Sequence, residues 1–170
     1  TAEQAHFTLL GQRAGHLLAS LVDDALDLTA VEEGRLEISL NEFSVKELVL
    51  GLVEDFERRA DTQGLSLHST VHPGVPASVV GDARRVRQIV GNFLSNAVKF
   101  TERGSVHLSV TATPDGKDHA SVRFVVTDTG CGIEPGLEKR LFQRFARGDH
   151  AGGPIPGTGL GLAIAADLAK

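Results

Sequence analysis

The chain has 170 residues, of which 41% are apolar and 23% are charged, the balance of a globular domain with a short appendage and not of a disordered segment. Its net charge of −5 argues against a dedicated nucleic-acid binder, and its single cysteine, Cys131, excludes an intrachain disulfide. No apolar run in the sequence approaches the roughly 20 residues that span a bilayer. We therefore expect a cytoplasmic protein without direct membrane contact.

The first predicted element is a long amphipathic helix over residues 1–33, a stretch without proline. Its apolar residues recur in steps of three, four and seven, at Leu10, Ala14, Leu17, Leu21, Leu28 and Val31. A helix of this length cannot bury such a stripe alone. The pattern therefore predicts that the helix pairs with other helices in a dimeric bundle.

Gly34 is expected to end that helix, and the alternating residues 35–40 predict a half-buried strand. Ser44 and Glu47 then form the pattern of a capping box, which predicts a helix from there to about Gln63, with Gly64 as its stop. The chain changes here from one long helix to a mixed arrangement of strands and helices.

Further strands are predicted over residues 65–71 and 78–80, and Asp82 is expected to cap the next helix. Two longer strands follow, Ser105 to Thr113 and Ala120 to Thr127, joined by a turn at 114–116. A short helical stretch around 137–145 and a last helix from about residue 158 complete the order. This order predicts an α+β fold, a two-layer α/β sandwich with helices on one mixed sheet, preceded by the long helix.

The helix that follows Asp82 carries two distinct rows of residues. The apolar row expected to face the core consists of Val86, Ile89, Val90, Phe93 and Ala97. The polar row consists of Gln88, Asn92, Asn96 and Lys99. Because asparagine in a helix costs about 0.5 kcal/mol relative to alanine, two of them one turn apart suggest a function: amide oxygens for a hydrated magnesium ion, beside a lysine for phosphate. A solvent-facing row is the alternative.

A buried-looking strand ends at Asp128 and is followed by Gly130 and Gly132. An aspartate at a strand end can accept a hydrogen bond from an exocyclic amine, and glycines let the backbone approach a flat ring. A simple tight turn is the alternative.

Near the end of the chain, residues 157–161 place three glycines at the start of a helix, where free backbone amides and the helix dipole favour an anion. A helix start that merely needs room is the alternative. Residues 141–147 and the glycine- and proline-containing loop after them have the layout of a lid over a ligand, or of a disordered connection.

The order and spacing of these segments resemble the ATPase-like catalytic domain of sensor histidine kinases. Asn92 to Thr101 resembles the asparagine box of that family, Asp128 to Ile133 its first glycine box, Leu141 to Phe145 its phenylalanine box, and Gly157 to Leu162 its second glycine box. Residues 16–36 resemble the second helix of the dimerisation domain and the linker after it. The resemblance implies a partial dimerisation domain over residues 1–34 and an ATP-binding catalytic domain over residues 35–170.

The resemblance also implies roles for individual residues, with ATP and Mg²⁺ as cofactors. Asn96 would hold magnesium with Asn92 beside it, Lys99 would contact phosphate, Phe100 would line the base pocket, and Asp128 would bind the adenine amine. The other residues implied in ATP binding are Gly130, Gly132, Arg144, Phe145, Arg147, Gly157, Thr158, Gly159, Leu160 and Gly161.

The chain departs from the family in two respects. The acceptor histidine, which the family follows with an acidic residue, is not found: Phe7 follows His6 and Leu17 follows His16. We therefore expect no catalytic residue in this chain and no autophosphorylation by it alone. The family's domain also continues into two further strands after the last helix, so part of the sheet is expected to be missing.

The expected function is to position Mg-ATP for phosphoryl transfer to a histidine on a helix that is absent here. The expected partners are a second copy, through residues 1–33 and the missing first helix, and the receiver domain of a response regulator. Related ATPases that hydrolyse their nucleotide carry a glutamate at the place of Asn92, and an amide cannot act as that base. The alternatives are an ATPase or serine kinase of the same superfold, and a non-catalytic dimerisation or interaction scaffold.

Overall fold

The computed structural model describes residues 37–117, 119–138, 140–144, 146 and 159–169, and ten single positions before them: 11, 15, 18, 22, 25, 26, 29, 30, 33 and 35. The chain divides into two compact units. One unit comprises Ile38–Lys139, and the other comprises Thr1–Glu37 with Arg140–Lys170. Each unit is described by itself.

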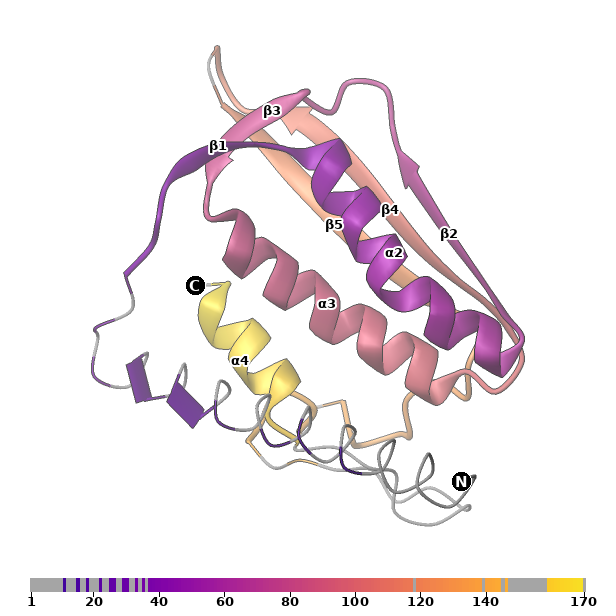
Figure 1. Ribbon diagram of the computed structural model, residues 1–170. Helices are drawn as coiled ribbons and strands as arrows, with labels where there is room; N and C mark the ends of the chain where they lie inside the picture. The colour runs from indigo at the N-terminus through magenta and orange to yellow at the C-terminus, as the bar shows by residue number, and fades with distance from the viewer. Residues whose placement is uncertain are drawn as a thin grey trace. The chain divides into compact units, whose positions relative to one another are not determined.

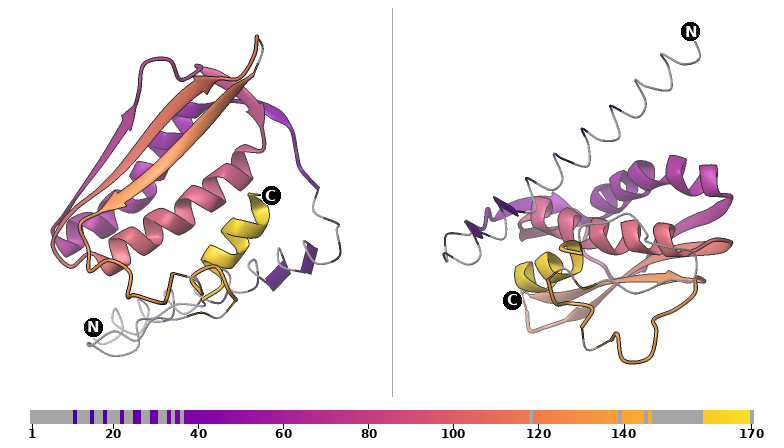
Figure 2. Two further views of the ribbon diagram at one scale, coloured as in Figure 1. Left: turned by 180° about the vertical axis from the view of Figure 1, so that it is seen from behind. Right: turned by 90° about the horizontal axis from the view of Figure 1, so that it is seen from below.

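The unit Ile38–Lys139 is a two-layer sandwich in which two helices cover one face of a sheet (Figures 1 and 2). Its elements are β1 (Asn41–Ser44), α2 (Val45–Gln63), β2 (Leu65–Val71), β3 (Ser78–Gly81), α3 (Ala83–Phe100), β4 (Gly104–Pro114) and β5 (Ala120–Asp128). The main sheet has the order β2-β4-β5, with β2 and β4 parallel and β4 and β5 antiparallel. Strands β1 and β3 form a separate antiparallel pair, so the described strands make two sheets where we expected one.

The strand predicted over residues 35–40 is wrong. The described residues of that stretch have no strand pairing, and β1 begins at Asn41, opposite Gly81. The amide of Ser39 donates instead to the carboxylate of Asp82, at 3.1 Å. Because Asp82 caps α3, β3 ends at Gly81 and offers β1 no further residue with which to pair. The alternation of residues 35–40 therefore reflects an extended segment and not a paired strand.

Helix α2 has the ends that its sequence predicts. The Ser44 hydroxyl accepts a hydrogen bond from the Glu47 amide at 3.2 Å, and Gly64 closes the helix with a left-handed backbone at φ 69°. Only glycine adopts this conformation without steric cost. With 19 residues, α2 is also the first helix that the described residues define from end to end.

Helix α3 begins at a buried carboxylate. Asp82 accepts from the amide of Arg85 at 3.0 Å with Oδ1, and from the amide of Ser39 with Oδ2. Burial alone would raise the pKa of this carboxyl, but the two amides, together with the nearby Arg84 and Arg85 charges, lower it below its ordinary value. Asp82 is therefore charged near neutral pH, and each of its two oxygens accepts from one backbone amide.

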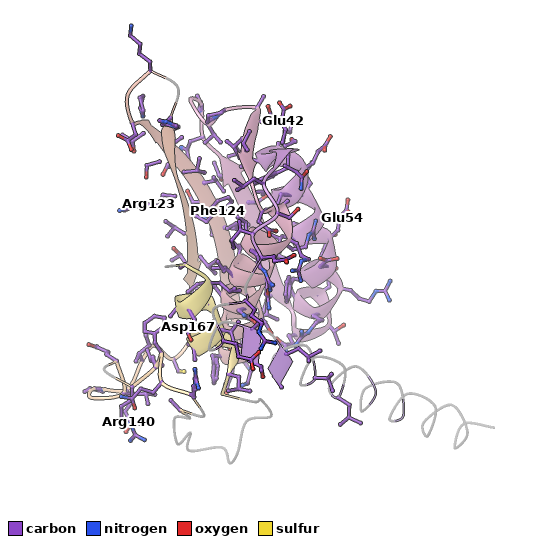
Figure 3. All side chains as sticks on the ribbon, turned by 90° about the vertical axis from the view of Figure 1, so that its left-hand side faces the viewer. Glu42, Glu54, Arg123, Phe124, Arg140 and Asp167 are labelled. Carbon is purple, nitrogen blue, oxygen red and sulfur yellow. The ribbon has the colours of Figure 1, made fainter. Side chains whose placement is uncertain are left out.

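The core of this unit lies between the two helices and the sheet. Its buried members are Val45, Leu48, Val49, Leu52, Ala60, Leu65, Val90, Leu94, Ala97, Val98, Val106, Leu108 and Val110. The apolar row predicted for α3 is partly wrong: Leu94 and Val98 are fully buried, while Phe93 is 37% exposed. The buried side of α3 includes Leu94 and Val98 because the helix packs against α2 as well as against β4 and β5. On β5, Phe124 points toward the core and Arg123 away from it (Figure 3).

The other unit contains α4 (Gly161–Leu168), which begins three residues after the predicted start. The helical stretch predicted over residues 137–145 is replaced, where it is described, by successive turns, including one from the Gln143 amide to the Arg140 carbonyl at 2.8 Å. Described residues between 11 and 30 have helical backbone, but most of residues 1–33 lie outside the described part, so the long front helix stays a prediction. Within the described part, no helix is long and apolar enough to cross a membrane.

Candidate nucleotide-binding site

The polar row of α3 lies along one side of the helix, and its predicted members Gln88, Asn92, Asn96 and Lys99 are all half-buried. The guanidinium of Arg85 donates to the Gln88 side chain at 3.0 Å and so extends the row by one turn. At the other end, the Lys99 ammonium lies 4.5 Å from the centre of the Phe100 ring, within range of a cation–π interaction. The row is held in place because Leu94 and Val98 fix the opposite side of α3 in the core.

Asp128 is the last residue of β5 and is exposed. Its Oδ1 accepts a hydrogen bond from the Gly130 amide at 2.8 Å. This bond to the backbone two residues ahead forms the local turn typical of aspartate. It fixes one carboxylate oxygen and leaves the carboxylate further acceptor sites for another donor.

Gly130 packs directly against the C-terminal end of α3. A Cβ atom at this position would lie 2.5 Å from the Phe100 carbonyl oxygen, 2.8 Å from Asp128 Oδ1 and 3.0 Å from Thr101 Oγ1. Contacts this short do not occur, so no side chain fits here unless the turn moves. The absence of a side chain thus brings the first glycine box against the end of the asparagine box, and both belong to one unit.

Thr129 attaches the turn after β5 to β4, a role that its neighbours in the sequence do not indicate. Its hydroxyl accepts from the Ser105 amide at 3.0 Å, and its own amide donates to the Ser105 carbonyl at 3.1 Å. The turn after β5 is therefore attached to the start of β4 on one side and packed against α3 on the other. Only the pairing of β4 with β5, a long-range feature, creates this role.

Thr101 is the second residue that sequence reasoning did not single out. It follows α3 as its C-cap, and only 2% of it is exposed. Within the described part of the chain, its hydroxyl has no hydrogen-bond partner. An unpaired buried hydroxyl typically costs about 1–3 kcal/mol, so its presence beside Asp128 and Gly130 needs an explanation.

The remaining predicted site residues are distributed over the two units. Gly132, in the unit of α3, has a left-handed backbone at φ 73°. In the other unit, Arg144 is exposed, Gly159 has φ 71°, and Leu160 is buried immediately before α4 begins at Gly161. The predicted residues Phe145, Arg147, Gly157 and Thr158 lie outside the described part of the chain.

The donor set on α3 fits a magnesium ion that arrives with a ligand. Among the described residues, no three histidine, cysteine or carboxylate side chains gather to hold a metal by themselves. Asn96, with Asn92 one turn before it, offers amide oxygens, and magnesium takes oxygen ligands while keeping several waters or substrate phosphates. Such a site requires a phosphate-bearing ligand to be complete.

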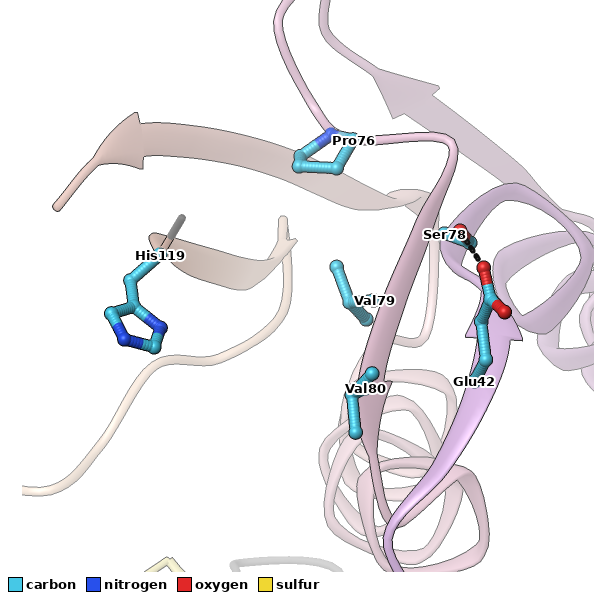
Figure 4. A pocket seen from close by; sticks show the side chains of 6 residues that line it. All are labelled: Glu42, Pro76, Ser78, Val79, Val80 and His119. Carbon is cyan, nitrogen blue, oxygen red and sulfur yellow. Dashed lines mark hydrogen bonds between the residues drawn. The ribbon is translucent and has the colours of Figure 1, made fainter. Parts of the chain in front are cut away.

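An open groove of about 410 Å³ lies elsewhere in the same unit (Figure 4). It is lined by Glu42, Pro76, Ser78, Val79, Val80 and His119. The Ser78 hydroxyl donates to the Glu42 carboxylate at 2.6 Å across the β1–β3 pair. None of the lining residues belongs to the predicted nucleotide site, so this groove is a separate feature.

Comparison with known proteins agrees with the motif order. Residues 81–170 match the family described as histidine kinase-, DNA gyrase B-, and HSP90-like ATPase. Hybrid signal transduction histidine kinase B from Dictyostelium discoideum is 35% identical over 158 residues, which make up 92% of this chain and 8% of that protein. The chain likewise spans a quarter or less of the other curated relatives compared, such as two-component system protein A from Emericella nidulans, of which it covers 25%.

Two solved structures extend this likeness to the fold. Full-length ShkA in complex with AMPPNP is 36% identical with a TM-score of 0.80, over 99% of this chain and 34% of that one. The mycobacterial sensor histidine kinase MprB is 31% identical with a TM-score of 0.59, over 76% of this chain and 78% of that one. The chain therefore belongs to the histidine kinase-, DNA gyrase B- and HSP90-like ATPase family, as an ATP-binding catalytic domain of the two-component sensor histidine kinase type.

Proposed function

We propose that this domain binds Mg-ATP and positions the γ-phosphate for transfer to a histidine on a helix that these 170 residues do not contain. The observation that carries the proposal is the packing of Gly130 against the end of α3. It holds the Asp128 turn next to the end of the helix that bears the asparagines and Lys99. This arrangement suits a nucleotide, whose base would lie at Asp128 and whose phosphates would lie along the helix.

The base is bound at the Asp128 end of the site. The Asp128 carboxylate accepts a hydrogen bond from the exocyclic amine of adenine, while Gly130 and Gly132 let the backbone approach the ring. Phe100, the last residue of α3, contributes an apolar surface to the base pocket.

The phosphates are bound along the polar row. When bound, magnesium neutralises phosphate charge. Asn96 would hold the ion through its amide oxygen, with Asn92 beside it, and the Lys99 ammonium attracts the phosphate oxygens. The family resemblance further assigns residues 157–161, Arg144 and Arg147 to phosphate binding, since backbone amides at a helix start and guanidinium groups are donors suited to phosphate oxygens.

The transfer step follows from this arrangement. A nitrogen of the acceptor imidazole bonds to the γ-phosphorus, the bond from that phosphorus to the β–γ bridging oxygen breaks, and ADP leaves. Catalysis rests on positioning and charge neutralisation, since little covalent chemistry is left to the protein. Asn92 cannot activate water as a base, so hydrolysis is disfavoured relative to transfer.

The proposed partners are a second copy of the chain and a response regulator. Leu18, Val22 and Leu26 recur every fourth residue and are 62%, 56% and 63% exposed. Four residues are slightly more than one helical turn, so these side chains lie along one side of a helix, and such an exposed apolar stripe favours pairing with other helices in a dimeric bundle. The phosphate would then pass to an aspartate of a receiver domain, the partner implied by the two-component context.

Calorimetric titration with a non-hydrolysable ATP analogue, with and without magnesium, tests the proposal. We expect magnesium-dependent binding that Asn96→Ala and Asp128→Ala each weaken at least tenfold, a loss of about 1.4 kcal/mol. Asp115→Ala is the matched control, because Asp115 lies in the turn at the opposite end of β5 and bonds His119 only through its backbone amide. Failure of the folded chain to bind would favour a non-catalytic scaffold.

Addition of a histidine-bearing partner helix separates kinase from ATPase activity. We expect phosphate to appear on the partner histidine while release of inorganic phosphate stays at background. Rapid phosphate release without the partner would support the ATPase alternative.

A further inference from the structure

The hydroxyl of Thr101 is a buried polar group without a structural use. It lies 3.0 Å from the place where a Gly130 side chain would begin, and the atoms around the same place are Asp128 Oδ1 and the Phe100 carbonyl oxygen. Both neighbours are hydrogen-bond acceptors, so the Thr101 hydroxyl is a donor set among acceptors. Among the described residues it is nevertheless unpaired.

Asp128 does not need this donor in the structure as it stands. Its carboxylate is exposed, so water can solvate it, and Oδ1 already accepts from the Gly130 amide. A purine bound at the carboxylate would displace that water. A desolvated carboxylate then needs additional hydrogen-bond donors.

We propose that Thr101 is a positioning residue for base recognition, whose hydroxyl donates to the Asp128 carboxylate when a 6-aminopurine nucleotide is bound. The inference rests on the proposed function, because it presumes that Asp128 binds the base. The bond fixes the rotation of the carboxylate, so that its other oxygen faces the exocyclic amine. Thr101 thereby sharpens the preference of the site for a 6-amino group over a 6-oxo group.

The proposal predicts effects of opposite sign on stability and on binding. Thr101→Val is nearly isosteric and removes only the hydroxyl, so the nucleotide-free protein should melt at the same or a higher temperature than the wild type. A hydroxyl with an ordinary structural bond would lower the melting temperature when removed.

The test measures, for the whole 170-residue chain with magnesium, the dissociation constants of ATP and of inosine triphosphate, which carries a 6-oxo group. Thr101→Val should weaken ATP at least about tenfold, the lower limit for one hydrogen bond to a charged group, and leave inosine triphosphate nearly unchanged. Thr101→Ser, which keeps the hydroxyl, should retain the wild-type ratio. In an Asp128→Asn background, Thr101→Val should cause no further change in the ratio.

Two results would overturn the inference while leaving the proposed function intact. The first is that Thr101→Val leaves both dissociation constants unchanged. The second is that it weakens both nucleotides equally and lowers the melting temperature. If Thr101→Val does not fold, Thr101→Ala removes the same hydroxyl and is judged by the same ratio. A folded wild type that binds neither nucleotide contradicts the proposed function itself. A wild type that binds both equally contradicts the base-reading role of Asp128 and Thr101 together.

Discussion

The two ends of α3 are closed by polar side chains that are used in opposite ways. At the N-terminal end, the buried Asp82 carboxylate accepts from two backbone amides and has its pKa lowered by them. At the C-terminal end, the Thr101 hydroxyl is equally buried but, within the described chain, unpaired. The first arrangement satisfies two backbone amides at the start of the helix, whereas the second leaves a buried hydroxyl beside Asp128 and Gly130. The two ends of one helix thus differ in how fully their polar groups are paired.

The largest change in stability is expected when the cap at the N-terminal end of α3 is removed. Asp82→Ala leaves the amides of Arg85 and Ser39 without their acceptor, and we expect a loss of about 2–3 kcal/mol in the free energy of unfolding. Urea denaturation measures it. Glu54→Ala, at an exposed position of α2, is the control and should change stability by less than about 0.5 kcal/mol. Similar losses in both variants would mean that the Asp82 carboxylate is no more important than an exposed one.

A large effect at the opposite end should come from Gly130→Ala. The added Cβ meets the Phe100 carbonyl at 2.5 Å, and backbone cannot yield as a flexible side chain can. We expect about 1–3 kcal/mol of destabilisation and a stronger loss of nucleotide binding, because Asp128 moves with the turn. Gly91→Ala is the control, since its Cβ would lie 3.8 Å from Leu52. Unaltered binding by Gly130→Ala would show that the turn need not be packed against α3.

Acid should affect the Asp82 end selectively. Because the folded-state pKa of Asp82 is lowered from 3.8, its contribution to stability is present above that value and is lost as the pH falls through the folded-state pKa. The stability difference between wild type and Asp82→Asn should therefore be constant above about pH 5 and shrink below about pH 4. Thermal melts over this range test it. A difference that grows on acidification would contradict the lowered pKa.

The smallest effect is expected from Thr129→Val, which removes the hydroxyl that accepts from the Ser105 amide. Because Thr129 is exposed and water can replace the bond, we expect about 1 kcal/mol or less in stability. Binding of the ATP analogue should weaken measurably, because the Asp128 turn loses one attachment to β4. Thr127→Val, at an exposed position near the end of β5, is the control. Equal affinities in both variants would remove Thr129 from the positioning residues.

The features that could be predicted well from the sequence are those that depend on interactions between neighbouring residues. Ser44, Glu47 and Gly64 specify both ends of α2 by local hydrogen bonding and backbone conformation, and Asp82 specifies the start of α3. The four boxes also identified the family, because each box is a short run of neighbouring residues and their order can be read directly along the chain.

What the sequence could not supply depends on contacts between distant segments. Residues 35–40 alternate as a strand does, but the partner ends at Gly81, so pairing starts at Asn41. The burial of Leu94 and Val98 in place of Phe93 depends on how α3 meets α2 and the sheet at once. The surroundings of Thr101 and Thr129 arise only where the turn after β5 packs against α3 and β4.

The parallel pairing of β2 with β4 has a consequence for the order of folding. Strands β4 and β5 are joined by a short turn, closed by the Asp115 amide and the His119 carbonyl at 2.9 Å, and such a hairpin forms in about 1–10 μs. In the parallel pair of β2 and β4, Leu65 lies opposite Gly104. This pair can form only after the connection between the two strands, which contains β3 and all of α3, has been closed. Closing that long loop slows folding. We expect the hairpin and α3 to assemble first and β2, with α2, to join last.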